Sequence, residues 1–258
     1  YICKECGKRF TALTNTIFDS KKIPISEWIE YLLHLFEFHS INSTAYDNRN
    51  SPTTGKYWLI KTFEVLKGIQ DDVVLDGTVY LDETYFTKVK SKLVTKDGKK
   101  LRGISRNKIG VGVACNETKS IFIVTGTSKP SRKSTIETYG KHIARGSVLV
   151  HDDEHSHSIL IEELELENIV YPTSETKGLS EKDNPLYPIN NLHLLLKQFI
   201  RNHGAYDREH LQDWLNLFWF IMNEPKDKYD KVLKFIELAV LSPKKVRYRD
   251  AMSSKHSK

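Results

Sequence analysis

Three polar side chains, far apart in the chain, carry oxygen atoms suited to a divalent metal: Asp82, Asp152 and Asn190. Carboxylate and amide oxygens are the ligands that Mg²⁺ and Mn²⁺ prefer in proteins. The two acids lie in or directly after apolar segments typical of strands, whereas Asn190 lies in a Leu-rich helical segment. Two strand-borne acids and a helical Asn form the arrangement that two-metal phosphoryl transfer requires. We therefore expect their oxygens to share one metal or to flank two.

The first acid, Asp82, has neighbours that are costly to expose to water. These neighbours are Tyr80, Leu81, Tyr85 and Phe86. A carboxylate placed among such residues is stable only if it is hydrogen-bonded, ion-paired or metal-bound. The surroundings of Asp82 therefore favour a functional or a paired carboxylate.

The second acid, Asp152, follows a short apolar run and falls just past the expected strand end, where α/β sheets place ligand-binding groups. Asp153 and Glu154 come directly after it, so the identity of the second acid is open between neighbours. We favour Asp152 because it follows the strand directly. His155 and His157 flank this acidic turn, and we expect exposed polar positions for them, with metal binding as the alternative.

The third group lies on a helix that carries Leu192, Leu194, Leu195 and Leu196. On this helix Asn190, His193 and Lys197 are spaced i, i+3 and i+7, so all three project from one face. Lys197 therefore lies two helical turns beyond the candidate metal ligand.

The elements that must position these residues follow a recognisable order. Strand patterns cover residues 79–86, 109–115, 121–125, 147–151 and 168–171, and helical patterns cover residues 135–143, 155–164, 187–203, 207–223 and 229–241. Residues 173–186 have no apolar periodicity and are expected to form a loop. Three strands followed by alternating helices and strands predict an α/β fold with an RNase-H-like mixed sheet and flanking helices.

Helical segments also precede the sheet. Apolar spacing predicts helices over residues 25–38, 40–48 and 51–66, which fit a small helix-turn-helix module. Lys56 and Lys61 on the last of these helices are expected near DNA phosphates or bases. We expect four regions: a partial zinc ribbon (1–20), the helix-turn-helix module (21–72), the catalytic domain (73–223), and a C-terminal helix with a basic tail (224–258).

The charge balance favours a polyanionic partner. The chain has 39 Lys and Arg against 33 Asp and Glu, a net charge of +6. Basic residues gather between positions 88 and 108, where Asp97 and Gly98 indicate a hairpin tip. We expect this segment to contact DNA phosphates. Its candidate contacts are Lys88, Lys90, Lys92, Lys99, Lys100, Arg102, Arg106 and Lys108.

With 39% hydrophobic and 28% charged residues, the composition is that of a globular protein. The ordered set of motifs resembles the Asp-Asp-Asn-Lys branch of insertion-sequence transposases, relatives of the Asp-Asp-Glu enzymes. The segments that carry the resemblance are Tyr80 to Phe86, Arg102 to Ser105, Leu149 to Asp152, Ile189 to His193 with Lys197, and His210 to Trp214. Members of this family usually have Thr-Asp at the second acid, whereas this chain has His151 and Asp152, followed by Asp153.

This resemblance implies roles for the candidate residues. Asp82, Asp152 and Asn190 would be the ligands of Mg²⁺ or Mn²⁺, Lys197 would contact DNA phosphate near the cut, and His193 would assist. The activity implied is cleavage and strand transfer of double-stranded DNA, on element ends and target, by a homo-oligomer assembled on DNA. Two alternatives stay open: an RNase-H-like nuclease without strand transfer, and a decayed transposase that only binds DNA.

The N-terminus contains half of a possible zinc site. Cys3 and Cys6 have the C-x-x-C spacing of a zinc knuckle, but a structural zinc site needs four ligands. The resemblance implies a full ribbon with an upstream Cys pair, and because the chain opens on Tyr1 we expect that upstream sequence has been lost. We therefore expect zinc only where that pair is present. The chain has neither a long apolar run nor a secretory pattern, so we expect a cytoplasmic protein without a membrane partner.

Overall fold

The computed structural model describes residues 1–19, 23–87, 97–99, 103–104, 107–127, 129–203, 208–241 and 244–252. The chain forms two compact units. The first unit comprises Tyr1–Lys67, Arg201–Ala205 and Phe220–Lys258, and the second comprises Gly68–Ile200 and Tyr206–Trp219. Residues from both ends of the chain thus build one unit, and the middle of the chain builds the other.

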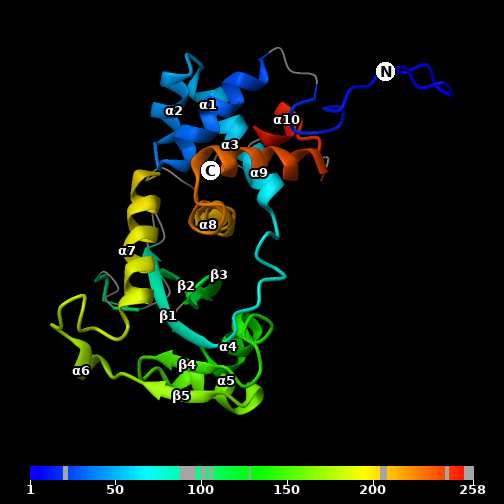
Figure 1. The fold of residues 1–258 in the computed structure, drawn as a ribbon. Coiled ribbons are helices and arrows are strands. Elements are labelled where there is room, and N and C mark those ends of the chain that lie inside the picture. Colours follow the sequence, from blue (N-terminus) through cyan, green and yellow to red (C-terminus); the bar gives the residue numbers. More distant parts are fainter. Residues whose placement is uncertain are drawn as a thin grey trace. The chain divides into compact units, whose positions relative to one another are not determined.

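The first unit is helical (Figure 1). Its helices are α1 (Ile25–Phe36), α2 (Ile41–Asp47), α3 (Pro52–Leu66), α9 (Lys228–Leu241) and α10 (Tyr248–Ala251). Ser40 and Ser51 begin α2 and α3 because their side chains accept hydrogen bonds from the backbone N–H groups of Ser43 and Thr54. The three predicted N-terminal helices are therefore present with bounds close to those expected.

Aromatic rings form the core of the first unit. Trp28 of α1 stacks on Trp58 of α3 with ring centroids 4.4 Å apart, and Tyr31 lies edge-on to both indoles. Phe36 contacts Phe235 of α9, so the C-terminal helix shares this core. Large buried rings contribute much of the burial energy of a unit this small.

The second unit contains one five-stranded sheet of order β3-β2-β1-β4-β5. The strands are β1 (Thr78–Thr87), β2 (Lys108–Cys115), β3 (Ser120–Thr127), β4 (Val148–His151) and β5 (Glu167–Val170). The first three pair in antiparallel fashion, and β1, β4 and β5 run parallel. This mixed order confirms the predicted RNase-H-like sheet.

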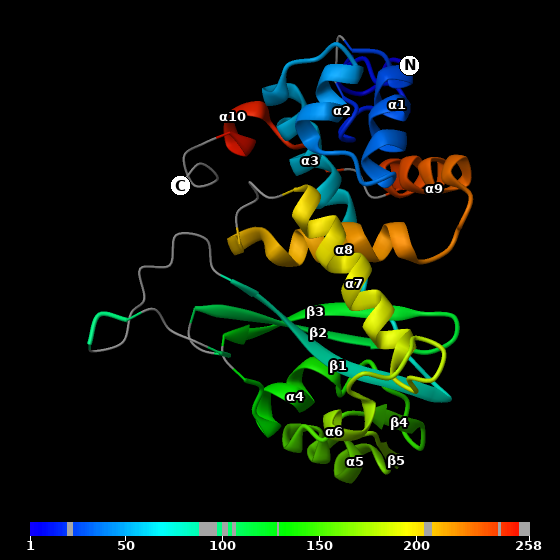
Figure 2. The same ribbon diagram turned by 90° about the vertical axis from the view of Figure 1, so that its left-hand side faces the viewer.

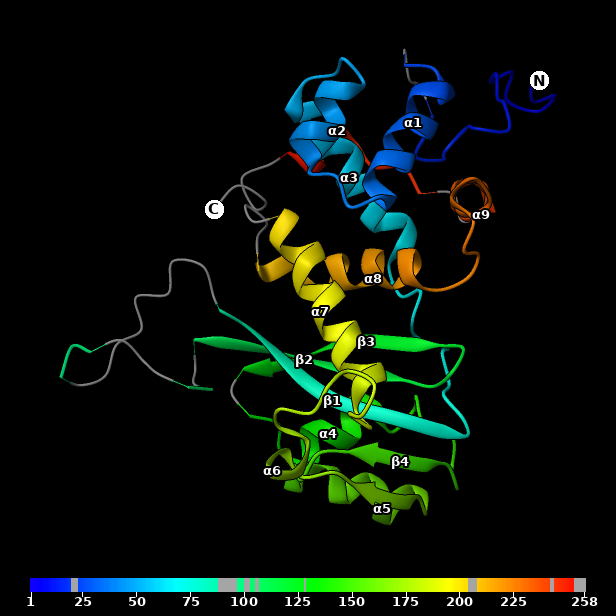
Figure 3. The ribbon, with the colours of Figure 1, turned by 60° about the vertical axis from the view of Figure 1, so that its left-hand side comes forward.

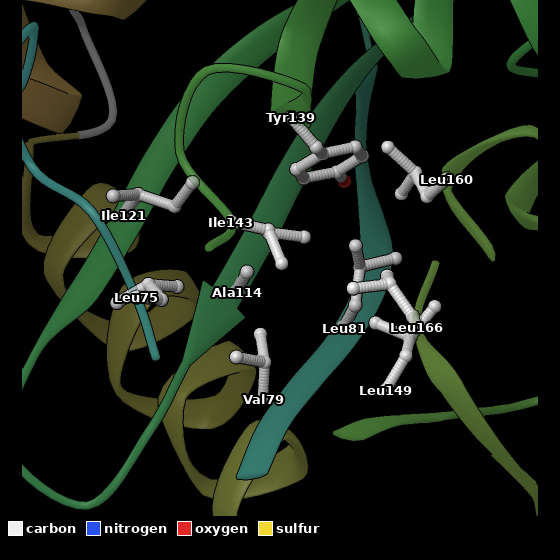
Figure 4. Close-up of a cluster of buried hydrophobic side chains, with 10 residues drawn as sticks. All are labelled: Leu75, Val79, Leu81, Ala114, Ile121, Tyr139, Ile143, Leu149, Leu160 and Leu166. Carbon is white, nitrogen blue, oxygen red and sulfur yellow. The ribbon is translucent and has the colours of Figure 1, made fainter. Parts of the chain in front are cut away.

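Helices cover both faces of this sheet (Figures 2 and 3). On one face, α4 (Arg132–Tyr139) and α5 (Ser158–Leu164) pack over an apolar cluster. Figure 4 shows that cluster, in which Tyr139, Ile143 and Leu160 meet Leu81 and Leu149 of the sheet. All five side chains are at most 3% exposed, so this face is closed to solvent.

The opposite face carries α7 (Tyr187–Asn202) and α8 (Leu211–Met222). Phe218 of α8 contacts Phe122 of β3 edge-on, with ring centroids 4.9 Å apart, and it also contacts Phe199 of α7. Trp219 donates a hydrogen bond from Nε1 to the carbonyl oxygen of Ser120. These contacts hold α7 over the sheet next to β1.

Smaller differences from the sequence-based expectations concern the connections. Residues 173–186, expected as a loop, contain the short helix α6 (Thr173–Thr176), and the 3-10 turn η1 (His155–His157) precedes α5. The helix expected over residues 207–223 is α8, which begins only at Leu211. None of the helices in the described part of the chain is long and apolar enough to cross a membrane.

Candidate active site

The register of the sheet places Asp82, in the middle of β1, beside Asp152, which directly follows β4. Leu81 of β1 pairs with His151, the last residue of β4, and the residues that follow this pair are Asp82 within β1 and Asp152 just past β4. The carboxyl end of a parallel strand is where α/β sheets place ligand-binding groups, and here that end belongs to β4. Asp152 is half-buried at that end, whereas Asp153 is exposed. This placement supports Asp152 as the second acid.

Asp82 is held in a fixed orientation. Its Oδ1 atom accepts a hydrogen bond from the backbone N–H of Glu83 at 2.7 Å, and its Oδ2 atom lies 3.6 Å from Nδ1 of His193. The side chain of Asp82 retains 28% of its exposure, so one side stays open to a ligand. A carboxylate held in this orientation can bind a metal ion or a proton.

The charge environment of Asp82 is unfavourable for a bare carboxylate. Burial raises the pKa of Asp82 to about 7, and the negative charges of Asp152 and Glu83 add to the rise. The hydrogen bond from the Glu83 amide and the nearby His157 act in the opposite direction. Two neighbouring half-buried acids thus leave negative charge that a bound cation would neutralise.

His193 is the α7 residue that the structure brings to Asp82. Its side chain is buried, and among the described residues its Nε2 atom has no hydrogen-bond partner. Burial and the charge of Lys197 lower the pKa of His193 to about 4, so its ring is neutral at pH 7. A neutral imidazole beside a carboxylate offers a lone pair or a single donor, and it adds no positive charge of its own.

The other two predicted α7 residues stay on the surface. Asn190 and Lys197 are exposed, about one helical turn before and after His193. Asn190 lines a shallow pocket with Leu179, Asn184 and neighbouring residues of the preceding loop. The helix therefore presents Asn190, His193 and Lys197 along one face, as predicted, with His193 as the member in contact with Asp82.

A buried polar network lies on the α4–α5 face of the sheet, behind the two acids. His157 Nδ1 lies 3.0 Å from His151 Nδ1, and His157 Nε2 lies 3.3 Å from both carboxylate oxygens of Glu83. Tyr139 donates its hydroxyl hydrogen to Glu83 at 2.8 Å, and His151 Nε2 lies 3.0 Å from Asn168 Oδ1. The expectation of an exposed polar position for His157 is wrong, because its side chain is 0% exposed.

One protonation pattern satisfies this network. If His157 is an imidazolium, it donates to Glu83 and to His151, and His151 donates its remaining N–H to Asn168. Burial lowers the pKa of His157, but the hydrogen bond and charge of Glu83 outweigh it and raise that pKa. Burial and the charge of His157 lower the pKa of His151. Glu83 and His151 directly neighbour Asp82 and Asp152 in sequence, so the network links the middle of β1 to the end of β4.

The sequence patterns predicted no role for Glu83 or Tyr139. The available signal was the strand alternation, which turns Glu83 to the sheet face opposite Asp82, where a buried carboxylate needs a partner. That partner could not be named because it comes from α4 and η1, which are remote in sequence.

The candidate DNA-binding residues divide into three groups. Lys56 and Lys99 are exposed, and Lys108 donates a hydrogen bond from Nζ to Thr87 Oγ1 at 2.7 Å. Lys61 is 1% exposed and donates to the carbonyl oxygen of Ile17, so it is withdrawn as a DNA contact. The remaining candidates lie outside the described residues: Lys88, Lys90, Lys92, Lys100, Arg102 and Arg106.

At the N-terminus, Cys3 and Cys6 form a small turn closed by the bridge between Ile2 and Arg9. Hydrogen bonds from the backbone N–H groups of Cys6 and Glu5 lower the pKa of the Cys3 thiol. Among the described residues, the clusters of three or more potential metal ligands include neither cysteine. The two thiols alone do not make a four-ligand zinc site.

The sheet order, with Asp82 on the central strand β1 beside Asp152 at the end of β4, defines a mixed α/β protein of RNase-H-like topology. No protein family model matches the chain, and no curated protein matches it in sequence. Solved structures do match in part. A pre-cleavage Mos1 transpososome matches at 13% identity and a TM-score of 0.33, over 95% of this chain and 83% of that chain.

Two further solved structures are similar at the same level. One is the Mos1 transposase catalytic domain with raltegravir and Mn, at 15% identity and a TM-score of 0.32, over 74% of this chain and 96% of that chain. The other is a simian T-cell lymphotropic virus intasome in complex with PP2A regulatory subunit B56 gamma. It matches at 9% identity and a TM-score of 0.35, over 73% of this chain and 67% of that chain. At TM-scores this low, the similarity does not identify the activity of this chain.

Proposed function

We propose that this chain is a divalent-metal-dependent phosphoryl-transfer enzyme acting on double-stranded DNA, the transposase of an insertion sequence. The observation that carries the proposal is that Asp82, within β1, lies beside Asp152, which directly follows the end of β4, and that burial and the negative charge of Asp152 raise the pKa of Asp82. The sequence motifs around both acids support the same activity.

The residues at this site fit Mg²⁺ or Mn²⁺. Asp82 and Asp152 supply carboxylate oxygens. Asn190, which is exposed on the same face of α7 as His193, would supply an amide oxygen. A divalent cation would neutralise the charge that disfavours ionised Asp82. The buried Nε2 atom of His193, which lacks a partner among the described residues, is a further sign of an incomplete site. When bound, the metal would supply Lewis-acid activation of water and of a DNA 3′-hydroxyl.

The chain's own residues have separate tasks in this proposal. The Glu83 amide and His193 orient Asp82, and the network behind β1 and β4 keeps both acids at a fixed separation. Lys197, exposed one turn beyond His193, would bind a DNA phosphate as a point charge. Because His193 is neutral, Lys197 and the metal would counter the negative charge of the phosphate.

The decisive experiment compares single variants on DNA that carries the flanks of the gene. With Mg²⁺ or Mn²⁺, Asp82→Ala and Asp152→Ala should lower cleavage at least about 100-fold, since each removes an oxygen ligand, while DNA affinity changes little. Asp153→Ala is the matched control and should keep cleavage. Asn190→Asp should stay active or change its metal preference, and Lys197→Ala should weaken the DNA complex.

Each outcome has a defined meaning. Wild-type cleavage by Asp82→Ala would refute the proposed active site. Metal-dependent cutting without joined products would identify a nuclease, and DNA binding without cutting by the wild-type chain would identify a protein that only binds DNA. Denaturation midpoints of all variants show whether a loss of cleavage reflects lost folding.

A further inference from the structure

A second cluster of possible metal ligands lies in the first unit, in elements separate from the acids discussed above. His34 is in the last turn of α1, His39 follows the end of that helix, and Asp47 is the last residue of α2. One ring nitrogen from each histidine and one carboxylate oxygen of Asp47 lie close to one another. The proposed DNA chemistry uses none of these residues.

The end of α1 explains why the two histidines meet. Phe38 has a positive φ of 66°. The N–H of Phe38 donates to the carbonyl oxygen of Leu35, and the N–H of His39 donates to the carbonyl oxygen of His34. This pattern is a Schellman motif. In such a motif the second residue after the C-cap, here His39, donates its N–H to a carbonyl oxygen in the last helical turn, here that of His34, and the two side chains contact each other. That contact is usually apolar, but here it joins two imidazoles. Their ring centroids lie 4.9 Å apart.

The three donor atoms have spacings suited to one cation. His34 Nδ1 and His39 Nδ1 lie 3.2 Å apart, and each lies 3.9 Å from Asp47 Oδ2. A tetrahedral Zn²⁺ ion with bonds of about 2.0–2.1 Å separates its ligand atoms by roughly 3.3–3.4 Å. Small side-chain movements would therefore bring all three atoms to bonding distance. Ser43 Oγ lies 3.5 Å from the same Asp47 oxygen and helps to orient it.

Exposure leaves room for a fourth ligand. The side chains of His34, His39 and Asp47 are 27%, 40% and 37% exposed. A water molecule can therefore complete the tetrahedron from the solvent side. Two imidazoles and one carboxylate select a transition metal over Mg²⁺, because imidazole nitrogen is a softer ligand than oxygen.

We propose that His34, His39 and Asp47 bind one divalent transition-metal ion, with Zn²⁺ as the best match to their geometry. The ligands are Nδ1 of both histidines, Oδ2 of Asp47 and one water. The ion joins the end of α1 to the end of α2. Because metal binds the folded arrangement, it raises the stability of the helical unit.

The test is a Zn²⁺ titration of the full chain, with Co²⁺ as a spectroscopic probe of the ligands. Both arms use a background of Cys3→Ser, Cys6→Ser and Asp152→Asn, which disables the thiol pair and the candidate active site. In this background we expect one Zn²⁺ per chain and a higher melting temperature with Zn²⁺. His39→Gln and Asp47→Asn should each lower Zn²⁺ affinity at least about tenfold, since each removes one of three protein ligands.

Circular dichroism without metal shows whether each variant is folded. Because His39 and Asp47 lie on different elements, one variant can still test the site if the other does not fold. Co²⁺ should give the visible absorption of a four-coordinate nitrogen and oxygen site, which His39→Gln should abolish. Unchanged Zn²⁺ affinity in both folded variants would overturn the proposal. So would the absence of Zn²⁺ binding in the background chain, because the trio would then be only a hydrogen-bonded helix end.

Discussion

At the residue scale, the charged form of Asp82 is unfavourable in the folded chain, because the side chain is buried next to two other acids. Its carboxyl group has a folded-state pKa of about 7, compared with an ordinary value of 3.8. Between these two pH values the folded chain binds a proton that the unfolded chain has already released. The stabilising contribution of protonated Asp82 is therefore present at low pH and is lost as pH rises through about 7.

We predict that Asp82→Asn stabilises the metal-free protein at pH 8, because a neutral amide avoids the cost of burying a charge and the repulsion from Asp152 and Glu83. The shift in pKa corresponds to at most about 4 kcal/mol, and partial exposure lowers the expected gain to roughly 1–3 kcal/mol. Urea unfolding with a chelator at pH 5 and pH 8 measures it. The wild-type chain should lose more stability between these pH values than the variant does.

Metal addition provides the control for this prediction. Mg²⁺ should raise the melting temperature of the wild-type chain at pH 8 and should leave Asp82→Asn nearly unchanged. The exposed neighbour Asp153 offers a matched substitution, Asp153→Asn, which should behave as wild type in both measurements. If Asp82→Asn were less stable than wild type at pH 8, the carboxylate would be an ordinary paired group.

At the element scale, the packing of α4 on β2 depends on one glycine. A Cβ atom at Gly112 would overlap the hydroxyl oxygen of Tyr139 and lie 2.7 Å from its Cζ atom. Gly112 pairs with Glu83 across the strands, and Tyr139 donates its hydrogen bond to that same Glu83. The absence of a side chain at residue 112 therefore lets the buried tyrosine reach the carboxylate behind Asp82.

We predict that Gly112→Ala lowers the free energy of unfolding by about 1–3 kcal/mol, because the added methyl group displaces the Tyr139 ring. In a Tyr139→Leu background the same substitution should cost less, since the overlapping atoms are gone. The double-mutant cycle, measured by urea unfolding, isolates this coupling. Equal costs in both backgrounds would mean that the helix adjusts freely and that Gly112 does not position Tyr139.

At the scale of the whole molecule, the C-terminal segment is part of the first unit. Lys228 of α9 forms an ion pair with Glu37 at 2.8 Å, and the hydroxyl of Tyr57 donates to the carbonyl oxygen of Val246 at 2.6 Å. The ring contact between Phe36 and Phe235 adds an apolar link. The helices that follow the sheet in sequence thus complete the core of the helices that precede it.

We predict that a chain ending at Asn223 loses protection of its first 67 residues. Removing α9 exposes Phe36 and leaves Glu37 and Tyr57 without the partners named above, so this unit should open more often. Limited proteolysis followed by mass spectrometry should show early cuts within α1 to α3. Removal of residues 253–258 alone is the control and should leave the cleavage pattern as in the full chain. Equal protection in both shortened chains would show that the N-terminal helices fold without α9.

The sequence alone was enough for the strands and most helix bounds, because these depend on local periodicity. The strand patterns also singled out Asp82 and Asp152, which the register of β1 and β4 makes neighbours, and their role as metal ligands stays a prediction. Burial depends instead on which remote segment covers a residue. Only the tertiary structure could therefore show that Lys61 and His157 are buried, and that Glu83 has Tyr139 as a partner. The meeting of His34 and His39 likewise depends on a left-handed Phe38, a conformation that its residue type does not predict.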